Sequence, residues 1–429
     1  MKGKFYFQCI TCGRHFDQDE VTYLCPYCSG KNVPGQPTRG ILKILYFYDQ
    51  IRRKFKQDKL FQELETSRFL PLLPVENVSS FSFLKVGDTP LYQMKELLIR
   101  ENRNKKSIPV PFGLFLKDDS QNPTFSFKDR ASNLVSAFAR EHDLDIIATA
   151  STGNAGSSLA GICASQNQKA IIFLPAAAPP AKLTQICMYG ALPVTVAGSY
   201  DDAFDLCLAA TDEFGWYNRN TAYNPLTIEG KKTVSYELYR QLGHTIPNRI
   251  FVPVGDGVIL SGVYKGLEDL LQLGLIEQLP VVVAVQASGS DNLVRNINNT
   301  AFTSHKSSTI ADSISVDIPR NFFMGRDYLL KYNGETITVS DQQILKASSL
   351  LARNSGIFCE PAAAAAYAGF LSYYQKNRIE ADSQNVILLT GSGLKDLQSV
   401  SSLVTLPEPV KPDLQSLIDS KFFRKPLHK

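Results

Sequence analysis

A series of apolar runs of strand length, each followed by a stretch of helical character, constrains the fold of this chain most. From residue 84 onward these runs fall at 113–117, 146–149, 169–174, 192–196, 249–253, 280–285 and 385–389. Strands that are apolar on both faces and separated by helices of about 10–15 residues indicate a parallel sheet covered on both sides. We therefore predict an α/β fold of layered parallel sheets in two lobes. Ligands of such sheets bind at the carboxyl ends of the strands.

Length and composition narrow the class of protein further. A chain of 429 residues is too long for one small core, which predicts about two or three domains. A net charge of +4 is small for this length and gives no indication of nucleic-acid binding. No apolar run approaches the roughly 18 residues of a membrane span, and the N-terminus lacks the apolar segment of a secretory signal. We expect a cytoplasmic protein that binds neither membranes nor nucleic acid.

Four of the eight cysteines form two pairs near the N-terminus, Cys9 with Cys12 and Cys25 with Cys28. Each Cys-x-x-Cys pair places two thiolates on one tight turn. Two such turns close a tetrahedral site for zinc with no open coordination position, so the metal would be structural. We expect a short hairpin between the two turns, in 13–24. Disulfides or unmetallated thiols are the alternative, which a cytoplasmic location disfavours.

One lysine, Lys128, follows a turn-prone Asn-Pro pair and precedes a segment that we expect to be helical, 130–140. An amine becomes nucleophilic near neutral pH when an apolar setting or a nearby cation disfavours its charge. Phe125 and Phe127 supply the apolar setting in this interpretation, and Arg130 supplies the cation. The expected chemistry is a Schiff base to a carbonyl, most often that of pyridoxal 5′-phosphate (PLP). An ordinary surface lysine at a helix start is the alternative.

Three polar loops that follow predicted strands complete a possible cofactor site. The loop from Ser151 opens a helix, whose N–H groups favour an anion such as a substrate carboxylate, and Asn154 is free to donate to a cofactor oxygen. After the last strand, the hydroxyl of Thr390 can face a pyridine nitrogen without protonating it. The remaining loop can form a backbone cradle for a phosphate and consists of Gly255, Asp256, Gly257, Val258 and Ile259. Each loop alone is ambiguous, but one lysine with three such loops is a coherent cofactor site.

Pro-rich and Gly-rich stretches at 33–38 and 69–74 suggest how the chain is divided. We predict a zinc ribbon at 1–36, a linker and N-terminal extension at 37–83, a large cofactor-binding lobe at 84–124 plus 241–405, a small lobe at 125–240, and a C-terminal tail at 406–429.

At this point the chain resembles the fold-type II PLP enzymes of the tryptophan synthase beta-like superfamily and, among them, the threonine synthases. The resemblance covers nearly the whole sequence, zinc ribbon included. Its motifs are Gly-Asp-Thr-Pro-Leu at 87–91, Ser-Phe-Lys-Asp-Arg at 126–130, the Asn154 loop, Glu-Gly-Lys-Lys-Thr at 229–233 and Thr-Gly-Ser-Gly-Leu-Lys-Asp at 390–396. Together they are more similar to threonine synthases than to serine/threonine dehydratases.

The resemblance implies a role for each matching residue. Lys128 would bind PLP covalently, Asn154 would hydrogen-bond its 3′-oxygen, the loop from Gly255 to Ile259 would hold its phosphate, and Thr390 would meet its pyridine nitrogen. The substrate carboxylate pocket would be lined by Ser151, Thr152 and Ala155. The implied reaction converts O-phosphohomoserine and water to threonine and phosphate, with the freed Lys128 amine moving protons at Cα and Cβ.

The chain departs from the family pattern at four places. Phe125 and Ala131 stand where the family usually has glycine, and the phosphate loop differs from the usual Gly-Asn-x-Gly-Asn, so Asp256 must point away from a phosphate. Many members have an arginine that binds the substrate phosphate where this chain has Thr227. Losing a guanidinium normally removes a charge-assisted pair. Either another cation replaces it, or the substrate is not O-phosphohomoserine; the candidate cations are Lys182, Arg219 and Lys231.

Two alternatives remain open from the sequence. A paralogous PLP enzyme would carry out β-replacement, as a cysteate synthase does on O-phosphoserine, or dehydratase-like ammonia elimination from a small amino acid. A non-catalytic regulatory homologue would use the ribbon for partner contact, but the presence of Lys128, Asn154 and Thr390 argues against it. The expected partner is a small-molecule amino acid, and a homodimer is possible by analogy with the fold alone.

Overall fold

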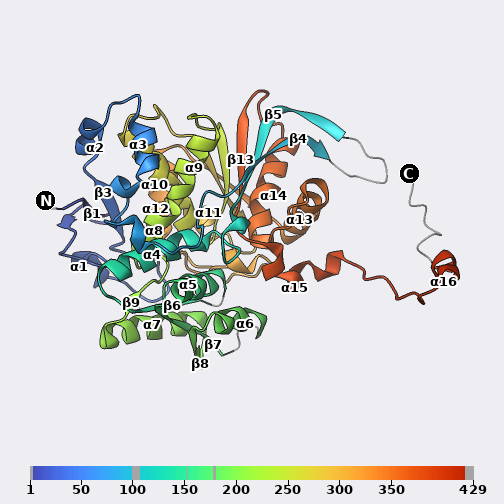
Figure 1. Ribbon diagram of the computed structural model, residues 1–429, viewed down its shortest axis with the longest axis horizontal. Coiled ribbons are helices and arrows are strands. Elements are labelled where there is room, and N and C mark those ends of the chain that lie inside the picture. The colour runs from blue at the N-terminus through green and yellow to red at the C-terminus, as the bar shows by residue number, and fades with distance from the viewer. Residues whose placement is uncertain (1–2, 99–106, 152, 177–179, 421–429) are drawn as a thin grey trace.

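The computed structural model describes residues 3–98, 107–151, 153–176 and 180–420, and shows two α/β lobes with a small N-terminal module packed against them (Figure 1). The prediction of a layered α/β fold in two lobes is confirmed, because each lobe has its own sheet covered by helices.

The larger lobe is built on a sheet of six strands. Their order is β12 (Glu335–Val339), β11 (Val281–Ala287), β10 (Arg249–Pro253), β13 (Gln384–Leu389), β5 (Ser107–Asp118) and β4 (Leu91–Leu98). All neighbours pair in parallel except β4, which pairs antiparallel with β5 and forms an edge hairpin. The predicted strand at 249–253 is confirmed residue for residue, whereas β4 and β12 were not predicted.

Helices cover both faces of this sheet because successive strand side chains point to opposite sides. Phe251 and Val283 face one side and join the core under α13 (Asp341–Ser355) and α14 (Pro361–Gln375). Ile250 and Val252 face the other side. The helices on that side are α8 (Leu226–Lys231), α9 (Thr233–Gln241), α10 (Val258–Gln272) and α12 (Phe322–Lys331).

The smaller lobe has a sheet of four parallel strands. Their order is β8 (Leu192–Val196), β7 (Lys169–Pro175), β6 (Ile146–Ala150) and β9 (Tyr217–Asn218). One face packs on α4 (Lys128–Glu141) and α5 (Asn154–Ser165), and the other on α7 (Tyr200–Phe214); α6 (Pro180–Met188) lies beside α5. The carboxyl end of β6 therefore presents the start of α5 to the larger lobe.

The N-terminal module has a three-stranded antiparallel sheet in which β1 (Phe5–Cys9) lies between β2 (His15–Asp17) and β3 (Leu42–Tyr46). The expected hairpin within 13–24 is wrong. That segment contains only β2, whose partner is β1, so the first Cys-x-x-Cys turn joins the two strands. The module also has three short helices: α1 (Pro26–Ser29) between β2 and β3, and α2 (Tyr48–Lys54) and α3 (Leu60–Thr66) after β3.

Polar contacts fix this module to both lobes. The hydroxyl of Tyr46 donates to Glu229 of α8 at 2.6 Å, and the hydroxyl of Tyr23 accepts from the backbone N–H of Asn218, at the end of β9, at 2.9 Å. The module therefore touches both ends of the segment that joins the small lobe to α8.

After α15 (Leu397–Val400) the described chain leaves the lobes and reaches the short α16 (Leu414–Asp419), away from the body of the molecule (Figure 1). The end of the predicted tail, 421–429, lies outside the described residues. One further short helix, α11 (Asn292–Asn296), lies between β11 and α12 in the chain. Among the helices of the described ranges, none is long and apolar enough to cross a membrane.

Candidate active site

A cavity of about 420 Å³ lies where the two lobes meet, and Lys128 is part of its wall. The small lobe contributes the start of α4 and the loop after β6, and the large lobe contributes the loop after β10 and the segment 312–320. Its volume falls in the range of small-ligand sites, roughly 300–1,000 Å³. The carboxyl ends of the strands, where we predicted that a ligand binds, therefore border a cavity of suitable size.

Lys128 is the first residue of α4, so the expectation of a helix from residue 130 is wrong by half a turn. The helix begins earlier because the preceding backbone is held by the loop after β13. The N–H of Phe127 donates to the carbonyl of Thr390 at 2.9 Å, and Ser126 pairs with Gly391. This contact fixes the position of the Lys128 amine relative to the Thr390 loop.

The cation Arg219 acts on the Lys128 amine, but so do the carboxylates of Glu360 and Asp256. Burial lowers the pKa of Lys128, the carboxylate of Glu360 opposes this, and the guanidinium of Arg219 reinforces it. Arg130 forms ion pairs with Asp119 and with Glu237 instead, each at 2.6 Å. Its assignment as the cation was therefore wrong.

The phenylalanine assignment was wrong in part as well. Phe127 is fully buried, but Phe125 is 49% exposed and does not line the cavity. Phe125 has a φ of +66°, the left-handed conformation that glycine adopts without strain. Phenylalanine at this position therefore does not narrow the pocket, and it carries the backbone strain that a glycine would avoid.

Asn154 is the first residue of α5 and lies between the lobes. Its amide donates to both oxygens of Glu360, each at 3.0 Å. Glu360 precedes Pro361 at the start of α14, and burial raises its pKa while Asn154 and Lys128 lower it. Glu360 was not among the predicted site residues. Its position directly before the proline that starts an alanine-rich helix is the feature of the sequence that could have indicated it.

The loop from Gly255 to Ile259 forms the start of α10, whose first N–H groups have no partner within the helix. Gly257 has a φ of +83°, and a Cβ on Gly255 would lie 2.9 Å from the Cα of Ile314, so the loop is held close to its neighbours. One oxygen of Asp256 accepts from the N–H of Arg320 at 3.2 Å. Burial raises the pKa of Asp256, against the lowering effect of the nearby cations. The cradle suits a phosphate bound by main-chain donors and the dipole of α10.

The structure brings most of the predicted residues into one cavity. Its lining includes Lys128, Ser151, Asn154, Ala155, Gly255, Asp256, Gly257, Val258 and Ile259. Thr390 is buried next to this wall but is not part of it, and Thr152 lies outside the described residues. The donors and the amine match the needs of PLP: a nucleophile for its aldehyde, an amide for its ring oxygen and a helix start for its phosphate.

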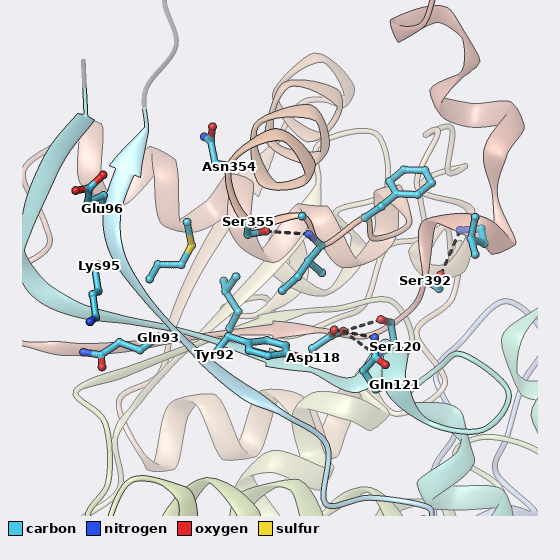
Figure 2. A pocket seen from close by; sticks show the side chains of 16 residues that line it. Tyr92, Gln93, Lys95, Glu96, Asp118, Ser120, Gln121, Asn354, Ser355 and Ser392 are labelled. Atoms are coloured by element: carbon cyan, nitrogen blue, oxygen red, sulfur yellow. Dashed lines mark hydrogen bonds between the residues drawn. The ribbon is translucent and has the colours of Figure 1, made fainter. Parts of the chain in front are cut away.

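A larger cavity of about 900 Å³ lies beside the β4–β5 hairpin and the end of α13 (Figure 2). Tyr92, Asp118, Asn354 and Ser392 are among its lining residues. None of the predicted site residues lines it. The nucleophile and the anion-binding helix starts belong to the smaller cavity.

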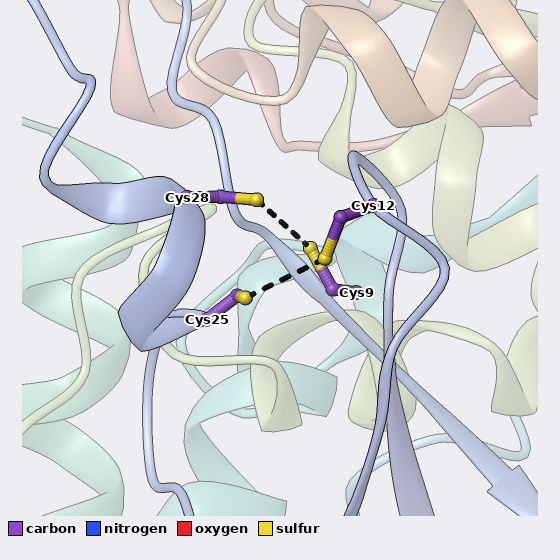
Figure 3. A group of neighbouring side chains, drawn as sticks. All are labelled: Cys9, Cys12, Cys25 and Cys28. Atoms are coloured by element: carbon purple, nitrogen blue, oxygen red, sulfur yellow. Dashed lines mark hydrogen bonds between the residues drawn. The ribbon is translucent and has the colours of Figure 1, made fainter.

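The four N-terminal cysteines converge as predicted (Figure 3). The sulfurs of Cys9 and Cys28 are 3.9 Å apart, as are those of Cys12 and Cys25, and all four lie within 4.8 Å of one another. A tetrahedral site with metal–sulfur bonds of about 2.3 Å places its sulfurs about 3.8 Å apart. The group therefore has the geometry to hold one metal ion.

The fold and the site together define a class of enzyme. Residues 83–391 match the family described as pyridoxal-phosphate dependent enzyme, and the chain belongs to that family. Curated relatives of the chain include threonine synthases. The chain is 34% identical to that of Methanocaldococcus jannaschii, over 94% of this chain and 96% of the relative, and 31% identical to that of Methanosarcina acetivorans, over 97% and 99%.

Solved structures show the same fold at lower identity. Processed threonine deaminase isoform 2 of Solanum lycopersicum aligns with a TM-score of 0.64 at 21% identity, over 82% of this chain and 89% of that one. O-ureido-L-serine synthase aligns with a TM-score of 0.62 at 19% identity, over 75% and 95%. The family model and the curated relatives support a PLP-dependent enzyme with a threonine synthase-like role, and the solved structures show the fold alone.

Proposed function

We propose that this protein is a threonine synthase, which converts O-phosphohomoserine and water to threonine and phosphate. The observation that carries the proposal is the Lys128 amine, which faces the cavity at the meeting of two helix starts and has no hydrogen-bond partner among the described residues. Relatives of that name align with the chain along nearly its whole length, N-terminal module included.

When bound, PLP supplies an electron sink that stabilises negative charge on substrate carbons. The residues of the chain do the remaining work. Lys128 would hold the cofactor, and its freed amine would take protons from Cα and Cβ and return protons to Cα and Cγ, a role that its lowered pKa suits. The Asn154 amide, which donates to Glu360 here, would turn one N–H to the ring oxygen of the cofactor. The starts of α5 and α10 bind the substrate carboxylate and the cofactor phosphate.

The proposed reaction balances without an added oxidant or reductant. Protons leave Cα and Cβ, the Cγ–O bond breaks, and phosphate departs with the bridging oxygen. Water then adds at Cβ, and protons return to Cα and Cγ to complete threonine. The Lys128 amine lies in the wall of the cavity, where we expect it to take and return these protons.

We further propose that the four cysteines bind a structural zinc ion. Four thiolates leave no coordination position for a substrate, and the module contacts the lobes through Tyr46 and Tyr23 rather than through the metal. Zinc would therefore stabilise the module that holds the segment from β9 to α8.

The alternative of β-replacement or ammonia elimination has one observation in its favour, the absence of an arginine at Thr227. The experiment that separates the functions is product analysis with purified, cofactor-loaded protein, given O-phosphohomoserine, O-phosphoserine or threonine in turn. The proposal predicts threonine and phosphate from the first substrate only. Release of an oxoacid and ammonia, or turnover of O-phosphoserine alone, would contradict it. Lys128→Ala should abolish both turnover and the visible absorbance of bound cofactor.

A further inference from the structure

Two buried cations next to Lys128 lack a counter-ion. Lys231 and Arg219 are both fully buried, and within the described ranges neither forms an ion pair. Every other cation buried to the same degree is paired with carboxylates: Lys117 with Glu237, Arg130 with Asp119 and Glu237, Lys232 with Glu229 and Asp269, and Lys265 with Asp269. Because an unpaired buried charge is costly, the exception needs an explanation.

Lys231 is the last residue of α8, and its side chain lines the cavity. Among the described residues, its amine donates to the backbone carbonyl of Thr227 alone, one helical turn earlier, at 3.0 Å. The neighbouring Lys232 makes a useful contrast, because its amine is enclosed by two carboxylates. Two adjacent lysines thus have different tasks: Lys232 belongs to an internal ion network, and Lys231 faces the ligand space.

Arg219 follows β9 and lies behind the same wall. Its Nε donates to Ser132, one turn after Lys128 on α4, at 3.3 Å, and its Nη1 donates to Thr221, which lines the cavity, at 3.0 Å. Its Nη2 is buried and has no partner among the described residues. Arg219 therefore places a donor that nothing satisfies beside the amines of Lys128 and Lys231.

The three cations act on one another. Burial lowers the pKa of Lys231 well below its ordinary value, and Arg219 and Lys128 lower it further, with Asp256 in opposition. Burial also lowers the pKa of Arg219 to about 10. The carboxylates of Glu360, Asp256 and Asp129 act on these cations but do not outweigh burial, because the pKa of each cation stays lowered. A bound dianion would relieve this unfavourable burial of positive charge.

We propose that Lys231, supported by Arg219, binds the phosphate monoester of a ligand in this cavity. The amine of Lys231 lies at the carbonyl of Thr227, so the cation missing from residue 227 is supplied by the next turn of α8. Both the cofactor and the proposed substrate carry this chemical group. The assignment to the substrate rests on the proposed function, whereas the assignment to the cofactor does not.

The test compares Lys231→Gln, which removes the charge, with Lys231→Arg, which keeps it. Two affinities are measured by calorimetry or absorbance: that of PLP for the cofactor-free protein, and that of inorganic phosphate for the cofactor-loaded protein. A charge-assisted contact predicts a loss of about tenfold or more in one of them for Lys231→Gln, with recovery in Lys231→Arg.

A loss of PLP affinity would assign Lys231 to the cofactor phosphate, and a loss of inorganic phosphate affinity with PLP affinity unchanged would assign it to the substrate phosphate. Both affinities unchanged in folded Lys231→Gln would overturn the proposal. Neither measurement needs turnover, so a failure of the proposed function would be seen separately, as wild-type protein that binds these anions but does not turn over O-phosphohomoserine.

Stability gives an independent readout. An amine kept for a ligand destabilises the ligand-free protein, so Lys231→Gln should raise the melting temperature of the cofactor-free protein. Lys232→Gln, the matched control, should lower it because Glu229 and Asp269 lose their partner. A fall for both variants would show that Lys231 is a structural residue.

Discussion

Restoring glycine at residues 125 and 131 should change the free energy of unfolding in opposite directions. Both positions are glycine in most of the family that the sequence resembles, but they differ in conformation here. Phe125 has a φ of +66° and is half exposed, whereas Ala131 is fully buried inside α4.

The magnitudes follow from these conformations. At residue 125, a side chain in the left-handed region costs about 1–2 kcal/mol, and glycine loses about 0.4–1 kcal/mol through the freedom of the unfolded chain. Phe125→Gly should therefore be more stable than Phe125→Ala by about 0.5–1 kcal/mol. At residue 131, glycine costs about 1 kcal/mol in helix propensity and up to about 0.8 kcal/mol in lost burial of a methyl group. Ala131→Gly should lose about 1–2 kcal/mol.

Urea unfolding followed by circular dichroism measures these differences in the cofactor-free variants. Phe125→Ala is the control that separates the loss of the ring from the relief of the backbone, and Phe125→Gly should leave KM unchanged because residue 125 does not line the cavity. Phe125→Ala more stable than Phe125→Gly would refute the left-handed conformation at this residue.

Three further predictions concern the module and the site. A chelator that strips the metal, or Cys12→Ser, should reduce the stability of the protein, measured as its melting temperature, more strongly than it reduces the turnover rate of the enzyme that remains folded. Fewer than about one zinc per chain in purified protein would contradict the premise. Burial raises the pKa of Glu268, but the positive charges of Lys43, Lys265 and Lys331 outweigh this effect and lower the pKa to about 2. Roughly 3 kcal/mol of stability, present above about pH 4.3, should therefore be lost as the pH falls towards 2. Lys43→Met should weaken that acid dependence, and an unchanged profile would exclude Glu268 as its source. Thr227→Arg should leave KM for O-phosphohomoserine unchanged or raise it, since residue 227 is fully buried and Lys231 already supplies a cation; a lower KM would count against this role of Lys231.

Local patterns in the sequence were sufficient for the features that depend on neighbours in the chain. The apolar run at 249–253 became β10, and the spacing of the cysteines gave four converging sulfurs. The polar strand β12 and the two-residue strand β9 have no such pattern, because their place at sheet edges is decided by the strands beside them.

Electrostatic partners were the part of the site that sequence proximity misplaced. Arg130 is two residues from Lys128, yet the fold pairs it with Asp119 and Glu237. Arg219, far away in the chain, is the cation that acts on Lys128. Glu360 likewise reaches Asn154 only through the meeting of α14 with the small lobe. Such pairs form between residues that are distant in the sequence and meet only in the folded lobes. The residues next to a charged side chain in the sequence therefore do not predict its partner.

In the proposed reaction, the cavity around Lys128 breaks the Cγ–O bond of O-phosphohomoserine and adds water at Cβ. Turnover in ¹⁸O-labelled water, followed by mass spectrometry of both products, tests it most directly. The account predicts equal amounts of threonine and phosphate, with one ¹⁸O in the threonine hydroxyl and none in the phosphate. Label in the phosphate with homoserine as the other product, or no turnover by protein with a normal visible cofactor spectrum, would contradict it.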